Sequence, residues 1–281
     1  MNVDSVVLEE KMEEEAVRWS AEEIEAGREA KRLLEEDEEF DNLLLDKRAL
    51  WLTVVNCKFE VKKARDKYKK WTSEMKTNFG IRGFGDDGVY KGGIFQDGTG
   101  DWTEIAPMFT AYAGCGLDNM NRSIMWIKTR PTTIEEEQLA IRAGAIYYTA
   151  IHADLISMRK GITLVLDTEG NTLQNKIGNE SKLQRVYQSI PLRPQKIFIL
   201  GAGWLKRTLI NGIIAFASLF TKEKVIERVE FCELERVKEG VSDESLPVHR
   251  GGQGGGLKDN MALVEWVKER LARFPAVPDY F

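Results

Sequence analysis

The chain has 281 residues with an ordinary globular composition, 43% hydrophobic and 30% charged, and is long enough to bury a large core. Its formal net charge is −5, which argues against a dedicated nucleic-acid-binding protein, because such proteins carry a large basic face that replaces phosphate counterions. Any contact with a membrane is therefore expected to be local.

The cysteines and the N-terminus indicate the compartment. Cys57, Cys115 and Cys232 are odd in number and widely spaced, so they predict neither a disulfide framework nor a zinc cluster. The first residues lack the basic and apolar regions of a signal peptide. The longest apolar run, residues 209–220, is shorter than the ~20 residues of a spanning helix. We expect a cytoplasmic, peripherally membrane-associated protein without a metal or another cofactor.

Two helical regions are predicted at the N-terminal end. Residues 1–40 are rich in Glu, Ala, Lys and Arg and predict an exposed, acidic helical extension, which is a candidate contact for a protein partner. Residues 41–78 predict an N-terminal helical module. Within it, residues 43–71 are expected to form one amphipathic helix, on which Phe59, Lys63, Lys67 and Lys70 share a side. A solvated face of a helical bundle is the simpler interpretation of these lysines.

Residues 79–103 are predicted to be a glycine-rich linker. The sequence GIRGFGDDGVYKGGIFQDGTG (residues 80–100) has too many Gly and Asp residues for a regular element to persist through it. No Gly-Lys-Ser/Thr follows these glycines, so a phosphate-binding loop is not favoured. The linker marks a boundary before a second domain, residues 104–281.

Strands and helices alternate in this second domain. Strands are expected at residues 123–128, 161–166, 196–200 and 229–232, and helices at residues 132–158, 183–189, 204–220 and 261–274. Such alternation predicts right-handed crossovers and a mainly parallel sheet. The near-continuous apolar strands are typical of a sheet that is covered on both faces.

Two patterns invite an enzymatic interpretation. Asp167 and Glu169 follow a strand, where metal-binding carboxylates often lie, but ordinary turn chemistry explains them better. Gly201-Ala202-Gly203 with Glu233 imitates a dinucleotide fingerprint, although Lys206 stands where the third glycine belongs. The sequence has two histidines but no Gly-x-Ser-x-Gly motif that would present a nucleophilic serine, so a serine hydrolase is not favoured. No catalytic residue is therefore assigned.

The helix predicted at residues 204–220 is apolar around most of its circumference. A buried core helix is the simplest explanation. Lys222, Lys224 and Arg228 follow it directly, however, and an apolar element bordered by cations suits contact with lipid tails and anionic headgroups.

Several segments in order resemble the CRAL-TRIO (Sec14-like) lipid-binding domain family. They are MRKGITLVLDTEG (158–170), LQRVYQSIPLRPQKIFIL (183–200), FTKEKVIERVEF (220–231) and Leu246-Pro247 with Gly251-Gly252, while KFEVKKA (58–64) resembles the family's N-terminal module. The resemblance implies an apolar cavity that holds one lipid between a sheet floor and a movable gate helix. The chain departs from the family at WLTVVNCKF (51–59), where more basic residues are usual, and at Val248-His249-Arg250.

The resemblance also implies site residues. The cavity walls would be Ile141, Ala145, Tyr148, Ile162, Leu164, Leu166, Leu183, Val186, Tyr187, Ile197 and Ile199, and the gate would be Leu209, Ile213, Phe216 and Phe220. An anionic membrane surface or a phosphoinositide headgroup would meet Arg193, Lys196, Lys222, Lys224 and Arg228.

The sequence thus predicts an α/β protein with a mainly parallel sheet, flanked by helices that enclose an apolar cavity with a helical gate, and preceded by an all-α module. We expect a lipid-binding and lipid-transfer protein that is not an enzyme. The alternatives are a ligand-free interaction scaffold of the same fold and a dinucleotide-dependent oxidoreductase.

Overall fold

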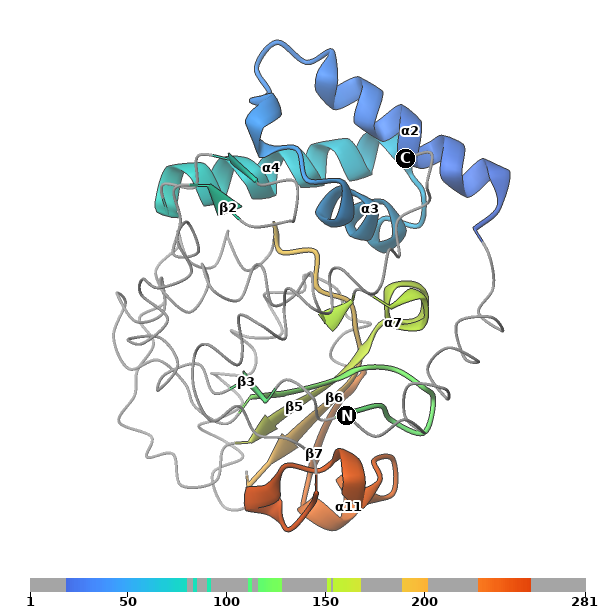
Figure 1. Cartoon of the computed structure of the whole chain (residues 1–281), viewed down its shortest axis with the longest axis vertical. Helices are drawn as coiled ribbons and strands as arrows, with labels where there is room; N and C mark the ends of the chain where they lie inside the picture. The colour runs from blue at the N-terminus through green and yellow to red at the C-terminus, as the bar shows by residue number, and fades with distance from the viewer. Residues whose placement is uncertain are drawn as a thin grey trace.

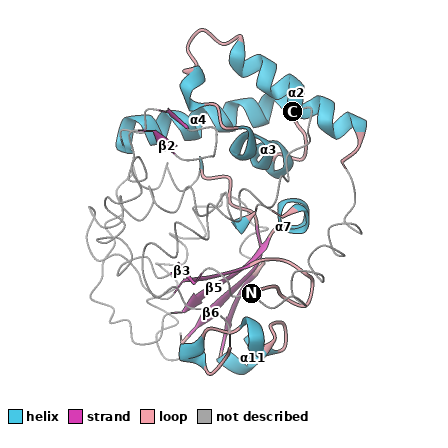
Figure 2. Cartoon of the chain, viewed as in Figure 1, coloured by secondary structure: helices cyan, strands magenta, loops and turns pink. Residues whose placement is uncertain are grey.

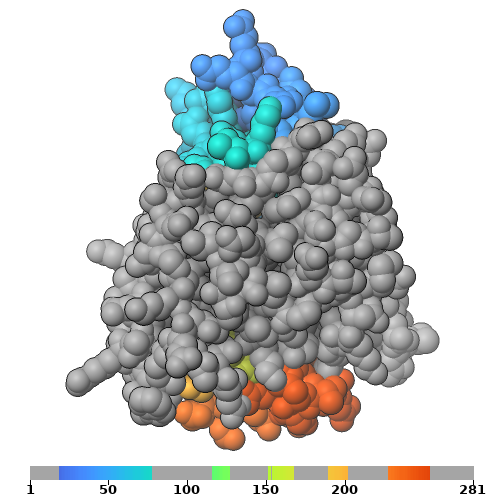
Figure 3. All heavy atoms as spheres, turned by 90° about the vertical axis from the view of Figure 1, so that its left-hand side faces the viewer, coloured from blue at the N-terminus to red at the C-terminus, as the bar shows by residue number. Residues whose placement is uncertain are grey.

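The fold is taken from a computed structural model of the whole chain, which describes residues 19–79, 83–84, 90–91, 111–112, 116–127, 151–152, 154–167, 189–201 and 227–253. Three helices lie together at one end of the molecule, and a five-stranded sheet lies below them (Figure 1). The short helix α11 (Leu234–Lys238) lies at the far side of the sheet (Figure 2). A view from the side places the first helices and residues 227–253 at opposite ends (Figure 3).

The first described helix, α2 (Ala21–Glu35), begins at a capping box. The Ser20 hydroxyl accepts a hydrogen bond from the Glu23 N–H, and the Glu23 carboxylate accepts one from the Ser20 N–H, so two otherwise unpaired donors are satisfied. Helix was correctly predicted here, but full exposure was wrong. Gly27, Ala30 and Leu34 are buried on one face at helical spacing, because α2 packs on its neighbours.

The single helix predicted over residues 43–71 is wrong. The chain forms a 3-10 turn, η1 (Asn42–Leu44), and two α-helices, α3 (Lys47–Asn56) and α4 (Val61–Phe79). Lys58 and Phe59 have φ angles of 56° and 62°, which end α3 and turn the chain back. Phe59 therefore lies in a turn rather than on a helix face with the lysines of α4.

Large aromatic side chains fill the space between these helices. Trp51, Tyr68 and Trp71 are fully buried, and the rings of Trp19 and Trp51 meet edge to face with centroids 5.0 Å apart. The Tyr68 hydroxyl donates to the Leu44 carbonyl oxygen at 2.9 Å and accepts from the Asp46 N–H at 2.8 Å. This one side chain satisfies two backbone groups of the segment that connects η1 to α3.

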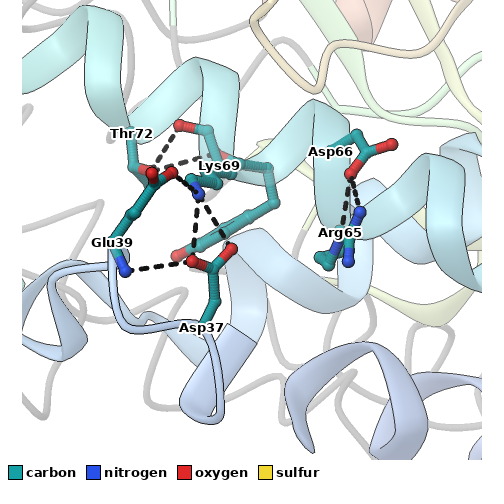
Figure 4. Close-up of polar contacts among 7 residues, drawn as sticks. Asp37, Glu39, Arg65, Asp66, Lys69 and Thr72 are labelled. Carbon is teal, nitrogen blue, oxygen red and sulfur yellow. Dashed lines mark hydrogen bonds and ion pairs between the residues drawn. The ribbon is translucent and has the colours of Figure 1, made fainter. Parts of the chain in front are cut away.

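Ion pairs fasten the outer loop to α4 (Figure 4). The Lys69 ammonium donates to Asp37 at 2.8 Å and to Glu39 at 2.9 Å, and Lys76 donates to Asp41 at 2.7 Å. Glu39 is largely exposed, as are many charged groups of this surface. Pairs in such surroundings contribute roughly 0–1 kcal/mol each, so the aromatic core holds the helices together more than these contacts do.

The sheet confirms the predicted parallel α/β arrangement. Its order is β3 (Ala111–Tyr112), β4 (Ile124–Ile127), β5 (Ile162–Asp167), β6 (Pro194–Leu200) and β7 (Val229–Cys232). Strands β4 to β7 are parallel, and β3 adds an antiparallel edge that the sequence did not reveal. A further pair, β1 (Gly83–Phe84) and β2 (Tyr90–Lys91), is antiparallel and lies inside the segment predicted as a linker.

The helix predicted over residues 132–158 does not run straight into the next strand. Ile151 is helical, His152 lies in a turn, and a separate helix α7 (Leu155–Lys160) starts at Asp154, whose carboxylate accepts from the Ser157 N–H at 2.7 Å. Gly161 ends α7 with a φ of 84°. A Cβ atom at this glycine would meet the Arg193 carbonyl oxygen at 2.4 Å, so strand β5 can start this close to β6 only from a glycine.

The C-terminal described segment covers one face of the sheet. It consists of α11 (Leu234–Lys238), η2 (Asp243–Ser245) and η3 (Val248–Arg250). Its Val237, Val241 and Leu246 form one core with sheet residues Ile124, Trp126, Val165, Phe198 and Leu200. A Cβ atom at Gly252 would meet the Leu246 carbonyl oxygen at 2.2 Å, so the segment folds back on itself at this glycine.

Candidate functional site

The predicted cavity floor lies on the face of the sheet opposite α11. Successive strand residues point to opposite faces, and Val165 and Phe198 belong to the core beneath α11. Leu164 is paired with Ile197 and Leu166 with Ile199, so these residues share the other face. Ile162, on the same side of β5, is fully buried together with Leu164, Ile197 and Ile199, while Leu166 is partly exposed. The floor residues expected on β5 and β6 are thus brought together.

Three residues that the sequence analysis did not name extend this floor. The register places Met125 beside Leu164, and on the other side Val229 beside Ile197 and Phe231 beside Ile199. All three are apolar. Their strands were predicted, so the rule of alternation along each strand was the signal that could have found them.

The rest of the predicted cavity lies outside the described residues. This holds for the wall residues Ile141, Ala145, Tyr148, Leu183, Val186 and Tyr187, for the gate residues Leu209, Ile213, Phe216 and Phe220, and for the basic residues Lys222 and Lys224.

Lys196 lies apart from the other basic residues that were predicted to meet a headgroup. It shares a face with Val165 and Phe198, its ammonium group forms an ion pair with Glu230, and it lies 5.0 Å from the centre of the Phe198 ring. Lys196 also lines a hollow of about 270 Å³ between α11 and the turn at residues 118–122. The other charged groups that line this hollow, Asp118, Arg122, Arg236 and Glu239, are likewise engaged in ion pairs.

Arg193 and Arg228 lie together at the opposite edge of the strands from Asp167. The Arg228 guanidinium donates to the Pro194 carbonyl oxygen at 2.8 Å, next to Arg193, and Arg193 makes a long hydrogen bond of 3.5 Å to the Val55 carbonyl oxygen. Within the described ranges neither arginine forms an ion pair with a carboxylate. Burial lowers the pKa of Arg193, and the nearby positive charges of Arg228 and Arg159 lower it further.

Arg159, in the last turn of α7, was not named by the sequence analysis. Its guanidinium donates to both carboxylate oxygens of Glu23, at 2.6 Å and 2.9 Å, and lies 4.2 Å from the centre of the Trp19 ring. Burial raises the pKa of Glu23, but the hydrogen bonds from Arg159 and from the Ser20 N–H outweigh this effect and lower the pKa overall. This contact joins the helical group to the edge of the sheet.

Asp167 ends β5 at its carboxyl edge, with its side chain fully buried. Its carboxylate accepts hydrogen bonds from Trp126 Nε1 at 3.3 Å and from Arg250 Nε at 2.8 Å, and Arg250 Nη2 bonds the second oxygen. His249 Nε2 lies 3.1 Å from the same carboxylate. Burial raises the pKa of Asp167, but these hydrogen bonds and the Arg250 charge keep it lowered overall.

The enzymatic alternatives gain little from this geometry. Arg250 takes up the carboxylate that a metal or a proton-transfer step would need, and Glu169 lies outside the described residues. No cluster of three or more potential metal ligands occurs in the described part of the chain. Of the dinucleotide-like pattern, Gly201 has a φ of 75°, while Glu233 is exposed at the start of α11.

Comparison with known proteins adds no assignment, because no protein-family model and no curated protein matches the chain. Within the described ranges, no helix combines the length and the apolar character that crossing a membrane requires.

Proposed function

We propose that this chain is a CRAL-TRIO-like lipid carrier, which holds one lipid against the floor of its parallel sheet, exchanges it at membranes and has no catalytic role. One observation carries the proposal. The floor face is apolar at Met125 of β4, Ile162, Leu164 and Leu166 of β5, Ile197 and Ile199 of β6 and Val229 and Phe231 of β7, whereas the face toward α11 includes Thr163, Asp167, Lys196 and Glu230.

This contrast is what a carrier needs. A lipid tail gains about 25 cal/mol for each Å² of apolar surface that it buries, and an unpaired polar group on the floor would offset that gain. The charged groups of the other face are paired with side chains there, as in Asp167–Arg250 and Lys196–Glu230. The apolar floor therefore supports a ligand site, and the α11 face supports a packed core.

A headgroup would meet the cations at the amino ends of the strands. Arg193 and Arg228 lie side by side without a carboxylate partner among the described residues. Arginines in this state attract phosphate, which can accept two hydrogen bonds from one guanidinium group. We therefore place the polar end of the lipid at this edge, and Lys222 and Lys224 remain predicted members of the same basic surface.

Extraction of the purified protein with organic solvent, followed by mass spectrometry, tests the proposal. A stoichiometric lipid is the expected result. An empty protein would favour the ligand-free scaffold, and a bound nucleotide would favour the oxidoreductase.

Two neighbouring residues of β5 provide a matched pair of variants. Leu164→Phe adds volume to the floor, which a cavity can absorb, so lipid loading should fall while the fold persists. Val165→Phe adds volume to the core beneath α11 and should destabilise the protein by about 1 to 3 kcal/mol. Equal destabilisation by both variants, with unchanged lipid loading, would show that the floor is packed protein.

Vesicle binding tests the basic edge. Arg193→Gln and Arg228→Gln should weaken binding to anionic vesicles more than binding to neutral ones, and added salt should reduce the difference. Lys196→Gln is the control, because Lys196 lies on the other face and is paired with Glu230. Equal loss in all three variants would point to net charge rather than to this edge.

A further inference from the structure

Arginines precede three neighbouring parallel strands. Arg159 comes shortly before β5, Arg193 directly before β6 and Arg228 directly before β7. Because parallel strands begin at the same edge of a sheet, the three residues gather there. Contacts confirm this: Arg193 packs against Gly161, two residues after Arg159, and Arg228 donates to the residue after Arg193.

The charges of this arginine row are unevenly compensated. Arg159 is paired with the Glu23 carboxylate through two hydrogen bonds, while Arg193 and Arg228 have no carboxylate partner in the described part of the chain. The lowered pKa of Arg193 reflects burial and the repulsion from the other two arginines. Among the described residues Arg193 and Arg228 thus lack a carboxylate partner, and an anion would be attracted to the row.

The Glu23 carboxylate is placed where an anion from solution could displace it from Arg159. Its side chain and that of Arg159 are 20% and 24% exposed, so an anion in solution can reach the pair. Glu23 comes from the first turn of α2, which is separated from Arg159 by 136 residues, so its position depends on how the helical group sits against the sheet. Its lowered pKa keeps it ionised at neutral pH.

We propose that Arg159, Arg193 and Arg228 form one phosphate-binding site at the amino edge of the sheet, and that the Glu23 carboxylate is an internal competitor which the phosphate displaces from Arg159. The inference rests on the proposed function, because a lipid headgroup is the phosphate that we expect there. A soluble phosphate has the same chemistry and is separated from the lipid by the experiment.

Glu23→Gln tests the competition. Glutamine retains the capping box of α2, since Glu and Gln are equivalent at this position, but it removes the negative charge that Glu23 places against Arg159. Binding to phosphatidylcholine vesicles that contain a phosphatidylinositol phosphate should tighten about fivefold, equivalent to about 1 kcal/mol for one released cation. Glu25→Gln is the control, because it removes the same charge from an exposed side chain of the same helix.

Two further measurements complete the test. In an Arg159→Gln background, Glu23→Gln should give no gain, because the cation that it releases is gone. Competition with inorganic phosphate separates the sources: displacement of the protein from the vesicles means that phosphate alone suffices, and no displacement means that the lipid headgroup is required. Tighter vesicle binding by Glu23→Gln supports the site in both cases, and the competition only identifies the source of the phosphate.

The inference is overturned if Glu23→Gln gives no gain, or only the gain of Glu25→Gln. Its failure is distinguishable from that of the carrier. An extracted protein without lipid, combined with a Glu23-dependent gain on vesicles, would reject lipid carriage and leave the phosphate site. A stoichiometric lipid without that gain would support lipid carriage and reject the phosphate site with Glu23 as its competitor.

Discussion

Arg250 holds the carboxylate of Asp167 with two hydrogen bonds, although the two residues are 83 positions apart in the chain. Asp167 ends the central strand of the sheet, and Arg250 ends η3 in the C-terminal segment. The pair therefore fastens the covering segment to the carboxyl edge of the sheet. Arg250 belongs to the stretch Val248-His249-Arg250, and the pair gives this stretch a structural role.

Asp167→Asn should lower the free energy of unfolding by about 2 to 3 kcal/mol, measured by urea denaturation. Asparagine keeps the shape but leaves the Arg250 charge poorly compensated in a mostly buried position. In the double variant with Arg250→Gln, the loss should be smaller than the sum of the two single losses, because both partners are removed together. An Asn variant as stable as the native protein would show that the ion pair adds no net stability.

The same pair predicts how stability depends on pH. The pKa of Asp167 is lowered in the folded protein, so the unfolded chain binds a proton at a higher pH than the folded one. The stabilisation is fully present above the unfolded pKa, and it is lost as the pH falls through the folded pKa. We expect the stability difference between the native protein and Asp167→Asn to be constant from pH 7 to about pH 5 and to shrink below about pH 4. A difference that grows on acidification would contradict this.

Three glycines of the C-terminal segment should respond differently to alanine. Gly252→Ala should destabilise most, by about 2 kcal/mol or more, because its Cβ would overlap the Leu246 backbone. Gly251→Ala has free space but a φ of 78°, so a loss of about 1 kcal/mol is expected. Gly240→Ala meets only an ordinary contact at 3.8 Å and should be nearly neutral. Thermal denaturation of the three variants checks the order.

Tyr68→Phe should destabilise the helical group by about 1 to 3 kcal/mol, because it leaves the Leu44 carbonyl oxygen and the Asp46 N–H buried without their partner. Thr72→Val is the matched control. The Thr72 hydroxyl donates to carbonyl oxygens within α4, which the helix already uses, so its loss should be below about 1 kcal/mol. Urea denaturation followed by tryptophan fluorescence measures both, and equal losses would argue against a special role of the tyrosine.

Among the described elements, the sequence predicted the strands of the sheet better than the helices of residues 43–79. A strand was predicted at residues 229–232, and the structure has β7 at the same residues. The break between α3 and α4 was missed because Lys58 and Phe59 carry no turn signature, although both adopt positive φ angles. Tertiary packing, which one sequence does not display, makes the turn favourable there.

Part of the candidate site could be predicted because it lies on strands that the sequence identifies. Leu164 and Ile197 were expected on one floor, and their pairing follows from strand alternation and register. The contacts of Asp167 with Arg250 and of Arg159 with Glu23 could not be predicted, because each joins segments more than 80 residues apart. Long charged side chains offer many such partners, and only the assembled fold selects one.

The strand order of the sheet also constrains how the protein is made. Strands β3 to β7 lie side by side in the order in which they occur in the chain, so each newly synthesised strand can pair with the one that precedes it. Helices α2, α3 and α4 are complete before the first of these strands leaves the ribosome. The covering segment is then the part that reaches back, because Arg250 must find Asp167 after β6 and β7 have been added. A chain truncated before residue 234 would thus leave the apolar residues that α11 covers, among them Trp126, Val165 and Phe198, open to aggregation.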